Sequence, residues 1–128
     1  MGGRYALQAT IAACHARAKT AEDTDWSRIA GLYAALYRLE PSPIIELNRA
    51  VAISMAHGPA LGLQVLDAIA DHPALANYHL LPSVRGDLLH KLQRYTEAAR
   101  ELERAAALTS NARERELLSQ RAKACRAH

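Results

Sequence analysis

Apolar residues recur at three- and four-residue spacing along nearly the whole chain, and proline or glycine interrupts the pattern at intervals. This periodicity constrains the fold more than any other feature, because it is the spacing of one face of an α-helix. Alanine, leucine and arginine, all strong helix formers, are abundant, and no stretch alternates β-branched residues over the length of a strand. The sequence therefore predicts an all-α protein. The segment 26–39 shows the pattern most clearly, with Trp26, Ile29, Leu32, Tyr33, Leu36 and Leu39 on one side.

Capping residues and breakers divide the pattern into seven expected helices. Asp25 is a suitable N-cap for the second helix, and Pro41 stops it. Ser42 followed by Pro43 is a favourable start for the third, and Asn111 with Glu114 three residues later resembles a capping box. The expected helices cover about residues 5–19, 26–39, 43–57, 59–70, 78–92, 95–108 and 111–126.

Each expected helix carries an apolar side that we predict to face the interior. The predicted inward residues are Leu7, Ile11, Cys14 and Ala18 in the first helix, Ile44, Leu47, Val51 and Met55 in the third, Leu63, Leu66 and Ile69 in the fourth, Leu81, Val84, Leu88 and Leu92 in the fifth, and Ala98, Leu102, Ala105 and Leu108 in the sixth. The last helix carries Leu117 and Leu118.

Short connections between these helices favour antiparallel hairpins, and the hairpins repeat. Trp26, Ala60 and Tyr95 occupy similar positions at intervals close to 34 residues, the period of a tetratricopeptide repeat (TPR). We predict one domain over residues 1–128, a TPR-like right-handed superhelix of antiparallel helix hairpins. Its repeats cover about 4–41, 42–73 and 77–110, and a capping helix covers 111–126.

The third repeat matches the TPR pattern best, and the others are degenerate. Gly86, Ala98 and Ala105 stand where that family has small packing residues, which allow paired helices to approach closely. Gln93, however, stands at the usual turn glycine, Ser110 at the usual proline, and Leu63 at a usual small residue.

A more specific resemblance covers nearly the whole chain. PSPIIELNRAVAI at 41–53, followed by HGPALGL at 57–63, resembles the C-terminal repeat domain of one group of bacterial extracytoplasmic-function RNA polymerase sigma factors. In that family the domain follows the sigma regions that bind core polymerase and promoter DNA. The resemblance implies a bacterial, cytoplasmic protein-interaction domain that regulates transcription initiation. Its partners would be the sigma regions in cis, core RNA polymerase or a regulatory protein.

The sigma regions themselves have no counterpart before Tyr5, and the chain contains no helix-turn-helix pattern. We therefore interpret Met1-Gly2-Gly3 as an artificial or truncated start and the chain as a fragment. The alternative is a free-standing TPR-type scaffold that binds a peptide or protein unrelated to transcription.

In repeat arrays of this kind, the first helix of each pair lines a concave surface that binds peptides. The polar residues expected there, as a candidate partner groove, are Asn48, Arg49, Arg85, Asp87, His90 and Lys91. A packing role competes with this interpretation. Arg85 lies close to the leucine stripe of its helix and is a candidate to pair with Asp87 or Glu46, and Asn48 is a candidate to bridge two helices. Few lysines are present, which disfavours a groove that binds a peptide C-terminus through its carboxylate.

No pattern of catalytic, cofactor-binding or metal-binding residues is evident, so we expect no enzyme activity and no cofactor. The six histidines (His15, His57, His72, His79, His90 and His128) form no metal-type pair. Glu22, Asp23 and Asp25 make an acidic loop without the spacing of a calcium site.

Composition excludes further classes of protein. The two cysteines, Cys14 and Cys125, lack the spacing of a zinc site or a disulfide framework, which fits a reducing compartment. No apolar run is long enough to span a membrane. The net charge of +3 is spread rather than concentrated with aromatic residues, so we expect no direct binding of nucleic acid. A second copy of the chain is a further candidate partner, because the end helices would expose apolar surface in an isolated fragment.

Overall fold

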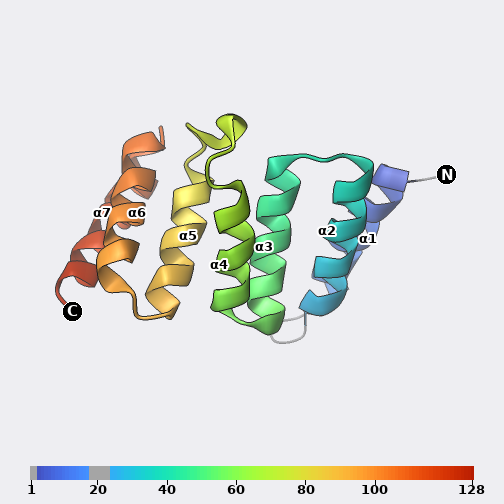
Figure 1. Cartoon of the computed structure of the whole chain (residues 1–128), viewed down its shortest axis with the longest axis horizontal. Coiled ribbons are helices and arrows are strands. Elements are labelled where there is room, and N and C mark those ends of the chain that lie inside the picture. The colour runs from blue at the N-terminus through green and yellow to red at the C-terminus, as the bar shows by residue number, and fades with distance from the viewer. Residues whose placement is uncertain (1–2, 18–23) are drawn as a thin grey trace. The chain divides into compact units, whose positions relative to one another are not determined.

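The computed structural model describes residues 3–17 and 24–128, which form seven α-helices, a short 3-10 helix and no strand. The all-α prediction is confirmed (Figure 1). The helices are α1 Gly3–Arg17, α2 Trp26–Leu39, α3 Pro43–His57, α4 Pro59–Ile69, α5 Leu80–Lys91, α6 Tyr95–Leu108 and α7 Ala112–Arg126, with the 3-10 helix η2 at Pro73–Leu75.

Local capping explains why the ends of α2 and α3 were predictable. The side chain of Asp25 accepts a hydrogen bond from the backbone N–H of Arg28 at 3.1 Å, as expected for an N-cap. Ser42 Oγ accepts from the N–H of Ile44 at 3.2 Å, and Pro43 is the first residue of α3. Among the predicted residues of the first helix and the acidic loop, Ala18, Glu22 and Asp23 lie outside the described residues.

The segment before α5 differs from the prediction. α5 begins at Leu80 rather than Tyr78, and the preceding residues form the 3-10 turn η2. His72 Nδ1 accepts from the N–H of Ala74 at 3.1 Å and thereby caps this turn, while Leu75 is fully buried and anchors it. The sequence signal was the proline at position 73, which favours the first position of a helical turn.

The chain divides into two compact units, Met1–Val65 and Leu66–His128. The predicted single domain over 1–128 and its repeats at about 4–41, 42–73 and 77–110 stay predictions.

In the first unit, α2 packs against both α1 and α3, and α2 and α3 run antiparallel side by side (Figure 1). The buried cluster that joins them consists of Ile11, Cys14, Ile29, Ala30 and Ala52, with Trp26, Leu32, Tyr33 and Ile53 packed against it. The predicted inward positions of α1 and α2 are thus confirmed at Ile11, Cys14 and Ile29, but the position predicted for Leu39 is wrong, because this last residue of α2 is 58% exposed.

The predicted inward side of α3 is wrong in part. Leu47 is buried, but Ile44 and Met55 are 44% and 42% exposed, and the other buried residues are Ile45, Ala50 and Ala52. Apolar residues surround most of this helix, so spacing alone did not decide which stripe faces inward. Alanines at the contact let neighbouring helices approach closely, which favours the stripe that carries them.

In the second unit, α6 packs against α5 and α7 (Figure 1). Ala98, Leu102 and Ala105 of α6 are fully buried, as predicted. Gly86 of α5 faces them so closely that a Cβ atom there would lie 2.9 Å from Leu102 Cγ. This close approach explains the predicted small residues at positions 86 and 98.

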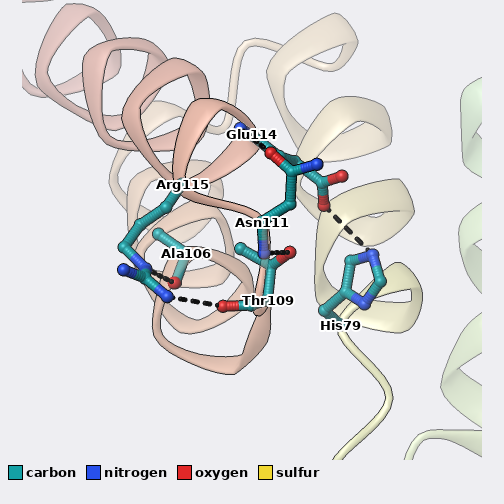
Figure 2. Close-up of polar contacts among 6 residues, drawn as sticks. All are labelled: His79, Ala106, Thr109, Asn111, Glu114 and Arg115. Carbon is teal, nitrogen blue, oxygen red and sulfur yellow. Dashed lines mark hydrogen bonds and ion pairs between the residues drawn. The ribbon is translucent and has the colours of Figure 1, made fainter.

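The start of α7 forms half of the predicted capping box (Figure 2). Asn111 Oδ1 accepts from the N–H of Glu114 at 2.9 Å. The Glu114 carboxylate does not return to the backbone of Asn111. It pairs instead with His79 Nε2 at 3.0 Å, while the N–H of Asn111 donates to Thr109 Oγ1 at 3.3 Å. The polar ends of α5 and α7 are therefore linked within the second unit.

Arg115 closes the end of α6 in the same region (Figure 2). Its Nη2 donates to the carbonyl of Thr109 at 2.9 Å, and its Nε donates to the carbonyl of Ala106 at 3.3 Å. Carbonyls at a helix C-terminus have no partner within the helix, so this arginine satisfies groups that would otherwise depend on water.

Candidate protein-binding surface

The first unit contains a cavity of about 360 Å³ between α1, α2 and α3. Its apolar lining comes from Ile11, Leu36, Ile44 and Ile45, of which all but Ile44 are buried. The remaining lining residues are Gln8, Ala12, Tyr33 and Asn48. Asn48 is thus the one predicted groove residue that lines this cavity.

Three uncharged polar side chains surround the cavity without a hydrogen-bond partner among the described residues. They are Gln8 of α1, Tyr33 of α2 and Asn48 of α3. Asn48 and Gln8 are exposed at the rim, and burial raises the pKa of the Tyr33 hydroxyl above its usual value of 10.0. The hydroxyl therefore stays neutral near pH 7, and the cavity carries no charge.

Arg49, predicted beside Asn48 as a groove residue, is held by its own helix. Its Nε and Nη2 donate to the two carboxylate oxygens of Glu46 at 2.6 and 3.0 Å. This bidentate hydrogen bond raises the pKa of Arg49. Arg49 is therefore engaged within α3, whereas Asn48 has no hydrogen-bond partner among the described residues.

Arg85 is half-buried, but the pairing with Asp87 or Glu46 that the sequence suggested is wrong. Its Nε and Nη2 donate to Asp67 Oδ1 at 3.0 and 2.9 Å, and its Nη1 lies 3.4 Å from Glu101 Oε1. Arg85 thus connects α4, α5 and α6 within the second unit. The reason is geometric: Asp87 lies two residues further along the same helix and points about 160° away from Arg85.

The other predicted residues of α5 are also engaged. Asp87 pairs with Arg121 of α7 at 3.1 Å and with Lys91 at 3.2 Å. His90 contacts the ring of Tyr95 edge-on at 5.5 Å, and Tyr95 stacks on His128 at 3.9 Å. Arg85, Asp87 and His90 thus contact other helices of the second unit, whereas Lys91 pairs within α5.

A second, smaller cavity of about 250 Å³ lies over α5 and α6 and has only charged lining residues, namely Arg85, Arg94, Glu97, Arg100 and Glu101. Glu101 Oε2 is buried there without a hydrogen-bond partner. Arg94 is paired with Glu97 at 2.6 Å. Three arginines and two glutamates leave a formal net charge of +1, so this cavity is fully charged in its lining and weakly positive.

Gln8 was not predicted as a site residue, and Tyr33 was predicted only as part of the apolar side of its helix. The available signal was weak: Gln8 is a polar residue next to the apolar stripe of the first helix, like many solvated glutamines. Within residues 3–17 and 24–128, no cluster of three or more His, Cys, Asp or Glu side chains is placed to hold a metal ion. No helix in this described part of the chain has the length and hydropathy to cross a membrane.

Comparison with known proteins finds one similar curated sequence at a significant level, an uncharacterized protein of Rhizobium meliloti (strain 1021). The two are 46% identical over 112 residues, which cover 88% of this chain. The chain spans only 26% of the length of that relative. No family model matches the chain, and no solved structure matches it.

Proposed function

We propose that the chain is a protein-interaction and regulatory domain that binds a partner through the α1–α3 cavity. The observation that carries this proposal is the set of free polar side chains, Gln8, Tyr33 and Asn48, around an apolar floor. Binding sites are typically concave and mostly apolar, with a few polar groups that fix orientation. The flanking helices α1 and α3 are the first helices of successive predicted hairpins, which is where repeat proteins bind peptides.

We propose further that this domain belongs to a sigma factor and acts on transcription initiation in the bacterial cytoplasm. The support is the resemblance of residues 41–53 and 57–63 to the C-terminal repeat domain of extracytoplasmic-function sigma factors. Its partners would then be the sigma regions of the same protein, core RNA polymerase or a regulator. The length of the Rhizobium relative is compatible with a domain inside a longer protein, since about three quarters of that relative lies outside the matched segment.

The two parts of the proposal are tested separately. The coding DNA upstream of the codon for Gly2 should encode sigma regions in the same reading frame. An unrelated upstream domain, or a native start at Met1, would reject the link to sigma factors and leave the alternative, a TPR-type scaffold with another partner.

A binding experiment tests the interaction itself. The immobilised chain should retain purified sigma regions or core polymerase from the source organism, and Asn48→Ala should reduce retention while leaving the circular dichroism spectrum unchanged. Equal retention by the parent and the Asn48→Ala chain would argue against the cavity as the binding surface.

A further inference from the structure

We propose that the α1–α3 cavity binds an internal, uncharged segment of its partner in an extended conformation, with one aliphatic side chain inserted, and does not bind a free chain terminus. This inference rests on the proposed function and deepens it, because it assigns the chemistry of the partner at the same cavity.

The floor of the cavity selects for an aliphatic anchor. Ile11, Leu36 and Ile45 are buried and contribute hydrocarbon surface to the cavity lining. A polar or charged side chain placed there would lose its hydration without gaining a partner, which is costly. An aliphatic side chain would gain the free energy of apolar burial. The volume of about 360 Å³ lies near the lower end of the range of roughly 300–1,000 Å³ for ligand sites, which fits a short anchor.

The rim selects for peptide groups. Asn48 and Gln8 lie on α3 and α1 at the cavity, and each carries an amide that both donates and accepts. A peptide group also offers one donor and one acceptor, so each amide matches one peptide group in a two-way hydrogen bond. An extended chain leaves its backbone N–H and C=O groups free for these hydrogen bonds, whereas a helical partner already pairs them within its own helix.

The absence of charged groups in the cavity lining selects against a chain terminus. A C-terminal carboxylate is normally recognised by cations, through charge-assisted hydrogen bonds. None of the lining residues is charged, and the nearest candidate in sequence, Arg49, already donates two hydrogen bonds to Glu46. A buried carboxylate would thus have amides and a tyrosine hydroxyl but no free cation. A free N-terminus would need an anion to pair with its ammonium group. The half-buried hydroxyl of Tyr33 remains neutral and does not supply one.

The test uses the whole chain as bait for two phage libraries of random twelve-residue peptides, one displayed between flanking sequences and one displayed with a free C-terminus. Selected peptides are then synthesised with either an amidated or a free C-terminus, and their affinities are measured by fluorescence anisotropy. We expect selection from the internal library, one aliphatic residue common to the selected peptides, and affinities that change less than twofold on amidation.

Two residues of α3 provide a matched pair of variants. Ile44 and Met55 are exposed to nearly the same extent, 44% and 42%, but only Ile44 lines the cavity. We expect Ile44→Ser and Asn48→Ala each to weaken peptide binding tenfold or more, and Met55→Ser to change it less than twofold. Thermal denaturation of all three variants verifies that each is folded.

The outcomes that would contradict the proposal distinguish the inferred chemistry of the partner segment from the protein-binding function of the cavity. Peptides that require a free carboxylate, and still depend on Asn48, would overturn the inference about the partner and leave the protein-binding function standing. Peptides that bind equally to the parent and to folded Ile44→Ser and Asn48→Ala chains would overturn the cavity as the site. Failure of both libraries to yield any binder would overturn the inference together with the proposed function.

Discussion

The first and second units are built from similar helices, but their polar side chains have different roles. In the first unit, Gln8, Tyr33 and Asn48 surround an apolar cavity and have no partner among the described residues. In the second unit, Arg85 and Asp87 are each tied to two other charged side chains, and Gly86 lies against Leu102 without space for a methyl group. The first unit therefore keeps neutral polar groups free beside an apolar cavity, whereas Arg85 and Asp87 of the second unit are engaged in ion pairs between helices.

This difference shows why residue type alone does not identify a binding surface. Asn48 and Asp87 are both polar residues of a first hairpin helix, and the sequence pattern treats them alike. Their roles depend on whether a complementary group lies across the helix interface. Arg121 of α7 forms an ion pair with Asp87, whereas no side chain of the described residues forms a hydrogen bond with Asn48.

The largest expected effect tests the tight packing of the second unit. Gly86→Ala places a Cβ atom 2.9 Å from Leu102 Cγ, so the core must shift, at a cost of about 1–3 kcal/mol in the free energy of unfolding. Gly31 in α2 is the control, because nothing lies within 4 Å of a Cβ there. Gly31→Ala should stabilise the chain by up to about 1 kcal/mol through helix propensity. Urea denaturation measures both, and equal effects of the two substitutions would contradict the difference in packing.

The next largest effect on stability is expected at the two positions with a positive φ, Gln93 and Gly58. Gln93, in the turn between α5 and α6, has a φ of 62°, a left-handed conformation that side chains disfavour. Gln93→Gly should therefore stabilise the chain by about 0.5–1 kcal/mol. Gly58, with a φ of 103°, already has the suitable residue at the end of α3, and Gly58→Ala should destabilise it. If Gln93→Gly lowers the midpoint of urea denaturation, the turn is not strained as described.

A smaller effect compares Asp87 and Asn48 directly. Asp87→Ala removes the ion pairs to Arg121 and Lys91 and should lower stability by up to about 1 kcal/mol, since these pairs are partly exposed. Asn48→Ala removes no hydrogen bond or ion pair within the described residues and should change stability by less than about 0.5 kcal/mol. The two substitutions should have the opposite order of effect on peptide affinity: Asn48→Ala should weaken peptide binding more than Asp87→Ala does. A loss of stability with Asn48→Ala that exceeds the loss with Asp87→Ala would contradict the distinction between the units.

The smallest effect is an exposed ion pair between α6 and α7. The hydrogen bond from Arg126 lowers the pKa of Glu103 below its usual value of 4.5. Because the folded pKa is depressed, the pair contributes stability above the unfolded pKa and loses it as the pH falls through the folded value. Carboxylate NMR should show a low pKa for Glu103 that returns to its ordinary range in Arg126→Gln. An unchanged pKa in that variant would exclude the pair in solution.

The sequence predicted what local chemistry decides and missed what neighbouring helices decide. α2 and α6 begin and end at the predicted residues, because Asp25, Pro41 and the turn at Gln93 act within a few residues of the helix ends. The stripe of α3 that faces inward, and the partners of Arg85, depend on helices that are distant in sequence. Asn48 was predicted as a candidate from its position, but only the structure distinguishes it from Arg49.

The central claim is that the first unit binds the partner and the second supports packing. The isoleucines test it in one measurement, since Ile11, Ile44 and Ile45 line the cavity and Ile69 lies in the second unit. Methyl NMR of the isoleucine-labelled chain, titrated with a selected peptide, should shift the signals of Ile11, Ile44 and Ile45 and leave Ile69 unchanged. A shift confined to Ile69, with the three cavity isoleucines unaffected, would contradict the account.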